Sequence, residues 1–293
     1  MFSGSMTAIV TPFCDGSIDA AALERLLELQ IENGTSAIVP CGSTGESATL
    51  THAEHAEVVR LAVKIVRGRV PIIAGTGSNS TSEAIALTQA AKDAGAAAAL
   101  LISPYYNKPT QEGIYQHYKA VAERTRLPLI VYNIPGRTAS KIEASTIARL
   151  AEIDGILGLK DATGSLDEVQ EVIRLCGDRI EVYSGDDSLT LPIMAVGGAG
   201  VISVAANVAP KQSADMVAAC LRGDWDNARR LHYRLLPLIR ALFLETNPIP
   251  VKAAVSMMGL CRDELRLPLL PMSDAPRAKL RSVMVEYGLL GAD

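Results

Sequence analysis

Eight short apolar runs recur along the chain as far as residue 207, and this repetition restricts the fold more than any other feature of the sequence. Each run is apolar throughout rather than alternating with polar residues, which is typical of strands buried on both faces of a parallel sheet. Amphipathic segments separate the runs, and the first two of these end at Gly34 and Gly68, a common helix terminator. The runs are residues 7–13, 36–42, 70–77, 97–104, 127–135, 155–162, 179–187 and 200–207.

This order of elements predicts an α/β fold, a closed (β/α)8 TIM barrel. Eight strand-and-helix units in about 220 residues match the size of such a barrel better than an open doubly wound sheet. After Ala209 the sequence shows helical segments and no further strand. We therefore expect a barrel over residues 1–224 and a C-terminal helical region over residues 225–293.

The composition argues against several classes of protein. The 28 Lys and Arg residues stand against 32 Asp and Glu, and a formal net charge of −4 disfavours a nucleic-acid-binding surface. Five widely spaced cysteines without a C-x-x-C pair indicate free thiols in a cytoplasmic protein rather than a disulfide framework or a zinc site. The first residues lack the pattern of a signal peptide, and no apolar run approaches the roughly 18 residues of a membrane span.

Polar side chains stand at the carboxyl ends of the predicted strands, where barrel enzymes place their active sites. Among them one lysine, Lys160, lies within a strand, in the stretch GLKDATG. With a period of two, Ile156, Gly158 and Lys160 share the face toward the barrel interior, and Leu157 and Leu159 face the helices. Such a lysine reaches solvent at the strand end, pairs with a carboxylate or takes part in chemistry, because burial of an unpaired ammonium is costly.

The chemistry that suits a buried lysine is Schiff-base formation with a carbonyl group. At the ordinary pKa only about one lysine in a thousand is uncharged at neutral pH, and desolvation raises that fraction. A tyrosine that shuttles protons can then turn the iminium of a keto acid into an enamine, which is a carbon nucleophile. Tyr132, within the run 127–135, is the candidate for this proton transfer.

Five motifs at strand ends resemble one family of enzymes, the dihydrodipicolinate synthases, also called 4-hydroxy-tetrahydrodipicolinate synthases. The motifs are GSTGES (42–47), PYYNKP (104–109), YNIPGRT (132–138), GLKDATG (158–164) and YSGDD (183–187), and the helical region adds NPIPVK (247–252). The resemblance runs from end to end. It implies a class I aldolase-type lyase that condenses pyruvate with L-aspartate 4-semialdehyde in lysine and diaminopimelate biosynthesis, without a metal or an organic cofactor.

The resemblance also implies roles for individual side chains. The catalytic residues are Lys160 as the Schiff-base residue and Tyr132, Ser43 and Tyr106 as a proton relay. The substrate-binding residues are Thr44 for the pyruvate carboxylate, Arg137 for the semialdehyde carboxylate, Gly185 and Ile202. Tyr106 is expected to enter the active site of a neighbouring subunit, within a homo-oligomer that we expect to be a tetramer.

Ser43 departs from the threonine usual in the synthases, although it keeps the hydroxyl. The spelling GSTGE is typical of N-acetylneuraminate lyases of the same superfamily, so such a lyase, or another pyruvate aldolase, is the alternative function. Arg137 in IPGRT favours the synthase, because the second substrate of those lyases is a sugar. A metabolite-binding barrel without activity is a second alternative, and the competent side chain at every catalytic position argues against it.

A further set of residues matches the site at which L-lysine inhibits synthases of this kind by feedback. The set is Ser47, Ala48, Leu50, His52, His55, Asn79, Glu83 and Tyr105. Glu83 also has a structural interpretation, since Ser80 with Glu83, like Thr51 with Glu54, fits the capping box at the start of a helix. We expect L-lysine to be an effector, with Glu83 on its α-ammonium.

Overall fold

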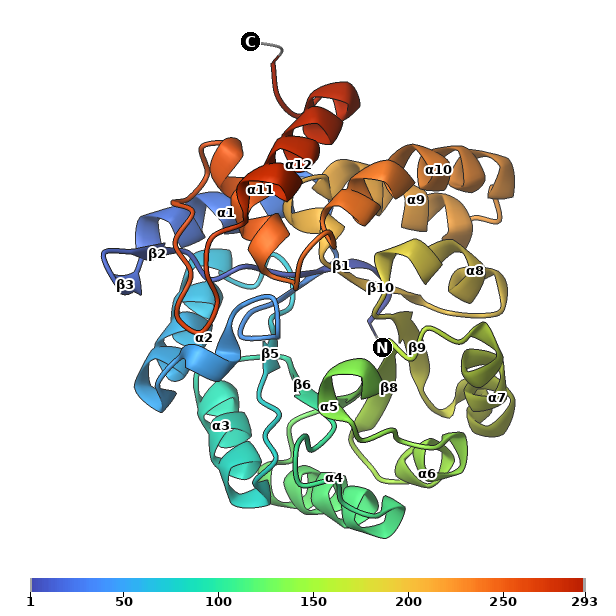
Figure 1. Ribbon diagram of the computed structural model, residues 1–293. Helices are drawn as coiled ribbons and strands as arrows, with labels where there is room; N and C mark the ends of the chain where they lie inside the picture. The colour runs from blue at the N-terminus through green and yellow to red at the C-terminus, as the bar shows by residue number, and fades with distance from the viewer. Residues whose placement is uncertain (1, 292–293) are drawn as a thin grey trace.

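The computed structural model describes residues 2–291. Eight parallel strands form a barrel, seen along its axis in Figure 1. In hydrogen-bonded order the strands are β4 (Ala37–Val39), β1 (Gly4–Ala8), β10 (Gly200–Ser203), β9 (Glu181–Ser184), β8 (Ile156–Asp161), β7 (Leu129–Asn133), β6 (Ala98–Ile102) and β5 (Ile73–Gly75). A parallel bridge between Ile38 and Ile72 joins the two ends of this order, so the sheet closes on itself.

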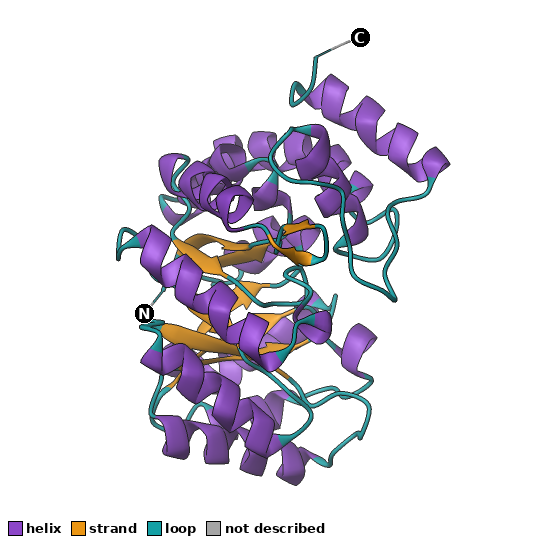
Figure 2. Cartoon of the chain, turned by 90° about the vertical axis from the view of Figure 1, so that its left-hand side faces the viewer, coloured by secondary structure: helices purple, strands orange, loops and turns teal. Residues whose placement is uncertain are grey.

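Helices cover the outside of the barrel and continue beyond it (Figure 2). Those between the strands are α1 (Ala20–Glu32), α2 (His52–Val66), α3 (Thr81–Asp93), α4 (Gln111–Thr125), α5 (Pro135–Thr138), α6 (Ala144–Leu150), α7 (Leu166–Cys176) and α8 (Thr190–Ala195). Those after the last strand are α9 (Pro210–Leu221), α10 (Trp225–Ala241), α11 (Ile249–Met257) and α12 (Asp274–Tyr287). The predicted (β/α)8 barrel, followed in the chain by C-terminal helices, is confirmed. No helix within residues 2–291 has the length and apolarity to cross a membrane.

The first strand begins earlier than its apolar run indicates. The predicted strand over residues 7–13 is wrong, because β1 is Gly4–Ala8 and the chain then enters a small hairpin of β2 (Phe13–Cys14) and β3 (Ser17–Ile18). β1 starts with glycine and serine, and glycine is depleted in strands generally. Glycine is needed on both strands of this pair, because a Cβ on Gly200 of β10 would lie 2.1 Å from the Gly4 carbonyl oxygen and a Cβ on Gly4 would lie 2.7 Å from Ser36 Oγ.

A β-bulge interrupts β8 before its carboxyl end. Leu129 of β7 pairs with Ile156, whereas the next residue, Ile130, pairs with Gly158. Because the extra residue shifts the alternation, Ile156 packs in the outer core with Leu129, and its predicted inward orientation is wrong. Beyond the bulge the alternation resumes, and Lys160 faces the interior as predicted.

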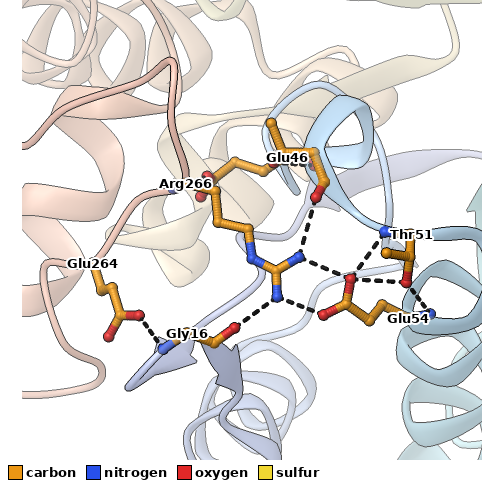
Figure 3. A network of polar contacts seen from close by, with 7 residues as sticks. Gly16, Glu46, Thr51, Glu54, Glu264 and Arg266 are labelled. Carbon is orange, nitrogen blue, oxygen red and sulfur yellow. Dashed lines mark hydrogen bonds and ion pairs between the residues drawn. The ribbon is translucent and has the colours of Figure 1, made fainter.

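A cluster of polar contacts ties the C-terminal region to the mouth of the barrel (Figure 3). Lys252 of α11 and Glu46, in the turn after β4, form an ion pair whose side chains are 0% and 1% exposed. Arg266, between α11 and α12, donates its backbone N–H to Glu46 at 3.1 Å and its guanidinium to Glu54 at 2.5 Å. Both cations lie over the Phe13 ring, at 4.2 and 4.4 Å from its centroid. The turn after β4 is therefore held by residues from the far end of the chain.

Candidate active site

Lys160 lies at the carboxyl end of β8 and faces the barrel interior. In the sheet register it stands between Tyr132 of β7 and Tyr183 of β9. The side chain is 5% exposed, and its Nζ is 4.3 Å from the centroid of the Tyr132 ring. Gly185 leaves room for it, because a Cβ there would approach Lys160 Cε to 3.1 Å. The alternative that Lys160 extends into solvent at the end of the strand is therefore excluded.

Burial sets the protonation of Lys160. Desolvation lowers the pKa of its ammonium to about 8, and the charge of Asp187 opposes this shift. The Asp187 carboxylate is itself held by other donors, namely Ser203 Oγ and the backbone N–H groups of Val204 and Ala205. With a pKa of about 8, about one amine in ten is uncharged at pH 7, against on the order of one in a thousand at the ordinary pKa. Lys160 is therefore a competent nucleophile near neutral pH.

Tyr132 provides a hydroxyl on the neighbouring strand. Its side chain is 6% exposed, and it forms part of the wall of the cavity described below. Burial raises the pKa of its phenol above the ordinary value, so the hydroxyl stays protonated at neutral pH. A protonated phenol beside a reacting amine can give up a proton and take it back, which is the behaviour of a shuttle.

The turn after β4 carries Ser43 and Thr44. The backbone N–H of Gly45 donates to the carbonyl of Gly42 at 3.0 Å, which closes the turn. A Cβ on Gly45 would lie 3.0 Å from the backbone nitrogen of Cys41, so the turn is built around glycine. Within residues 2–291 the N–H groups of Ser43 and Thr44 have no protein acceptor, which leaves them available to the oxygens of a ligand.

Arg137 of α5, the short helix after β7, is linked to the turn after β4 through Asn247. Its Nη2 donates to the backbone carbonyl oxygen of Asn247 at 2.7 Å. Asn247 in turn donates its side-chain Nδ2 to Thr44 Oγ1 at 3.0 Å. The sequence assigned Asn247 no role, and its one signal there is that it is the polar residue that begins the motif NPIPVK (247–252).

A cavity of about 450 Å³ opens at this end of the barrel. Its wall includes three predicted catalytic or substrate-binding residues and seven predicted effector residues, namely Ser43, Tyr132, Arg137, Ser47, Ala48, Leu50, His52, His55, Glu83 and Tyr105. The structure thus brings part of each predicted group to one cavity, whereas Lys160, Thr44, Tyr106 and Gly185 are not among the residues that line it. Ile202 does not line the cavity either, because its side chain is fully buried in the inner core of the barrel.

Tyr106 does not join the other relay residues within this chain. Its side chain is 88% exposed, and the residue has a left-handed φ of 71°. The Asn107 N–H donates to the Tyr105 carbonyl at 2.9 Å, so the backbone turns tightly around Tyr106. A left-handed backbone conformation is energetically costly for a bulky residue. Such strain is common at functional positions, which makes the exposed Tyr106 ring a candidate for a functional contact.

Glu83 is the charged centre of the effector group. Its carboxylate accepts hydrogen bonds from Ser78 Oγ and, at 2.5 Å, from His52 Nε2. The hydrogen bond from Ser78, helped by that from His52, lowers the pKa of Glu83, so it is an anion at neutral pH. The predicted capping box with Ser80 is wrong, because Ser80 forms no side-chain cap and Glu83 is engaged elsewhere. The box of Thr51 with Glu54 is confirmed.

Two of the predicted effector residues, His55 and Asn79, have hydrogen-bond partners within the chain. His55 is 5% exposed, and its Nε2 donates to the Gly75 carbonyl at 2.7 Å. Burial lowers the pKa of this imidazole, which keeps it neutral. Asn79 does not contribute to the cavity wall, and its backbone carbonyl accepts from Asn107 Nδ2 at 3.0 Å. A ligand in this part of the cavity would meet the neutral ring of His55 rather than a cation.

Comparison with known proteins agrees with this geometry. The model of the dihydrodipicolinate synthetase family matches residues 1–286. The chain belongs to this family. The 4-hydroxy-tetrahydrodipicolinate synthase of Citrifermentans bemidjiense is 57% identical over 290 residues, which are 99% of this chain and 100% of that protein. The enzyme of Pelobacter propionicus is 54% identical over the same lengths.

Solved structures of the family superpose closely. Dihydrodipicolinate synthase of Acinetobacter baumannii in complex with pyruvate has a TM-score of 0.98 at 48% identity, covering 99% of this chain and 100% of that chain. The enzyme of Cyanidioschyzon merolae with lysine bound has a TM-score of 0.96 at 41% identity, covering 99% of both chains. A monomeric dihydrodipicolinate synthase variant has a TM-score of 0.97 at 45% identity, covering 99% of this chain and 98% of that chain.

The family assignment that the motifs predicted is thus confirmed, and so is the enzyme class. The chain is a lyase of lysine and diaminopimelate biosynthesis, and pyruvate condensation is the activity that membership in the family carries.

The depressed pKa of Lys160 predicts the pH dependence of adduct formation. We expect the rate of the pyruvate adduct on Lys160 to rise about tenfold per pH unit below about pH 8 and to level off above it, because only the uncharged amine attacks. Borohydride trapping between about pH 6 and about pH 10, followed by peptide mass analysis, measures this rate. Lys252 is an internal control, because its side chain is fully buried and paired with Glu46, and it should remain unmodified. A rate that still climbs at about pH 10 would contradict the depressed pKa.

Proposed function

We propose that the chain forms a Schiff base between Lys160 and pyruvate and adds the derived enamine to L-aspartate 4-semialdehyde, giving 4-hydroxy-tetrahydrodipicolinate. The observation that carries this proposal is a buried lysine of pKa about 8 beside a protonated tyrosine, with Arg137 on the wall of the neighbouring cavity. The names of the curated relatives support the product. The pyruvate complex of the Acinetobacter baumannii enzyme supports the first substrate.

In the proposed reaction the uncharged Nζ of Lys160 attacks the keto carbon of pyruvate, and the carbonyl oxygen leaves as water after taking up protons. Loss of a proton from the methyl carbon then gives the enamine, whose carbon attacks the aldehyde of the second substrate. Tyr132 gives and accepts protons in these steps, because its neutral phenol adjoins the amine. Attack by the amino group of the second substrate on the iminium carbon closes the ring and releases Lys160.

The proposed binding residues follow the two carboxylates. Thr44, with the free N–H groups of the turn after β4, takes the pyruvate carboxylate. Arg137 takes the carboxylate of the semialdehyde, for which a planar guanidinium is well suited. Ser43 and Tyr106 extend the relay from Tyr132. Gly185 lies against Lys160, and Ile202 contributes through its backbone, since its side chain is buried in the core.

The alternative that Ser43 raised is a lyase acting on N-acetylneuraminate. Arg137 argues for the synthase, because an arginine on the cavity wall fits a second substrate with a carboxylate of its own, which the sugar half of N-acetylneuraminate lacks. Ser43 keeps the hydroxyl that the relay needs. A barrel that binds metabolites without reaction is disfavoured by the pKa of Lys160, since binding alone does not require a reactive amine.

Arg137→Ala tests the second substrate. We expect it to lower kcat/KM for the semialdehyde by about one to two orders of magnitude, because the carboxylate would lose a charge-assisted hydrogen bond. Pyruvate should still form its adduct on Lys160, which borohydride trapping measures. Arg137→Lys, which keeps the charge and loses the forked geometry of the guanidinium, is the matched control. Its kcat/KM for the semialdehyde should lie between those of the wild type and of Arg137→Ala. Faster cleavage of N-acetylneuraminate than condensation by the wild type would favour the lyase.

We propose further that L-lysine inhibits this enzyme from the part of the cavity around Glu83. The anionic Glu83 suits the α-ammonium of an amino acid, and Tyr105 and Asn79 are proposed for its carboxylate. Ser47, Ala48, Leu50, His52 and His55 are proposed to surround the side chain. The lysine complex of the Cyanidioschyzon merolae enzyme supports such a site. Tyr105 adjoins Tyr106, which offers a short path for coupling to the relay.

Glu83→Gln tests this effector site. We expect it to raise the lysine concentration for half inhibition by at least about tenfold, because a charge-assisted hydrogen bond to the ammonium is lost. Condensation without lysine should stay near the wild-type rate. Glu57→Gln on α2, which removes an exposed carboxylate paired with Arg60, is the matched control and should not change inhibition. Calorimetry that detects no lysine binding to the wild type would remove the proposal.

A homotetramer is the proposed assembly, in which Tyr106 enters the site of a neighbouring subunit. The support is the exposed ring at a strained backbone position. The monomeric synthase variant shows that proteins of this family also exist as single chains. The cytoplasm is the proposed location, since all five cysteines, at positions 14, 41, 176, 220 and 261, are free thiols.

Tyr106→Phe tests the assembly. We expect it to lower kcat by about a hundredfold, because a proton relay loses a hydroxyl. The melting temperature and the sedimentation coefficient should be unchanged, since the ring remains. Tyr233→Phe, which alters another exposed tyrosine, is the control and should be fully active. A wild-type enzyme that sediments as a monomer at full activity would contradict the shared site.

A further inference from the structure

Asn247 lies between α10 and α11, far along the chain from the barrel residues that it contacts. It is 6% exposed and forms part of the cavity wall. Its side-chain Nδ2 donates to Thr44 Oγ1 at 3.0 Å, and its backbone carbonyl oxygen accepts from Arg137 Nη2 at 2.7 Å. One residue therefore contacts both side chains that are proposed to hold the two substrate carboxylates.

The bond to Thr44 has a chemical consequence. A hydroxyl has one proton to donate and two lone pairs that accept. Among the hydrogen bonds of residues 2–291, the Thr44 hydroxyl takes part in one, and there it accepts from an amide N–H. Its own proton is therefore free to be donated to a ligand. An anionic carboxylate needs a donor at this point, so Asn247 sets the hydroxyl in the useful polarity.

The bond to Arg137 acts on the other carboxylate. The guanidinium has five N–H donors, and the Asn247 carbonyl takes one of them. The remaining donors keep their fork, now fixed in direction, which reduces the freedom that a ligand would otherwise have to remove. This contact uses the backbone of Asn247, so a change of its side chain leaves it in place.

We propose that Asn247 is a positioning residue that holds Thr44 and Arg137 together, and that its side chain acts on pyruvate binding alone. The inference rests on the proposed roles of Thr44 and Arg137. It predicts that loss of the Asn247 side chain weakens binding of pyruvate but not of the semialdehyde, because the two substrates depend on different atoms of the same residue. A general structural role would affect both substrates.

The test measures KM for each substrate in Asn247→Ala. We expect KM for pyruvate to rise about tenfold, the effect of one lost hydrogen bond. KM for the semialdehyde should change less than about twofold, since the backbone carbonyl remains on Arg137. Equal increases in both values would overturn the proposal, and so would an unchanged KM for pyruvate.

Two further variants keep the test decisive. Asn247→Asp preserves the shape of the side chain. Its carboxylate would accept the hydrogen bond of the Thr44 hydroxyl and repel the pyruvate carboxylate, so KM for pyruvate should rise about a hundredfold. In a Thr44→Val background, Asn247→Ala should raise KM for pyruvate no further, because the hydroxyl that it orients is gone. Additive effects of the two substitutions would contradict the inference.

Borohydride trapping separates this inference from the proposed function. A wild type that forms no adduct on Lys160 would refute the function itself. A wild type that forms the adduct, with the same pyruvate dependence in Asn247→Ala, would refute the positioning role alone.

Discussion

The buried ion pair of Glu46 with Lys252 is the contact on which the mouth of the barrel depends. Both side chains are out of water, so each charge would be costly without the other. The remaining acceptor of Glu46 takes the backbone N–H of Arg266, and the Phe13 ring lies against the ammonium. Glu46 has a left-handed φ of 55° and ends the turn that carries Ser43 and Thr44, so the ion pair fixes an unfavourable backbone conformation where the site needs it.

The C-terminal helices are consequently part of the active site. Lys252 and Asn247 come from the same segment and hold the turn after β4 at two points, one through Glu46 and one through Thr44. Asn247 also reaches Arg137, so the groups proposed for both substrates share a support outside the barrel. The strands supply the reactive lysine and its tyrosine, and the helical region supplies the geometry of the binding groups. Neither part would form the site alone.

The sequence indicated those features that depend on local pattern. Continuous apolar runs predicted the barrel, and a lysine within one of them identified Lys160. The start of β1 was missed because Gly4 is a poor strand former and pairs only through close approach to Gly200. The bulge that turns Ile156 outward depends on how two strands register, which no single run records. The contact of Asn247 with Thr44 spans 203 positions of sequence, so only the folded chain reveals it.

Lys160 and Lys252 show how two buried residues of one type come to have different roles. Each is almost fully buried and lies over an aromatic ring, at 4.3 Å from Tyr132 and 4.2 Å from Phe13. Burial lowers the pKa of Lys252 as well, but the Glu46 carboxylate is in direct contact with its ammonium and opposes that shift, which suits a structural cation. For Lys160, the charge that most opposes desolvation is that of Asp187, whose carboxylate oxygens accept hydrogen bonds from other donors. Desolvation therefore dominates, and the ammonium of Lys160 loses its proton more readily than usual. The position of one carboxylate thus decides which lysine supports the fold and which one reacts.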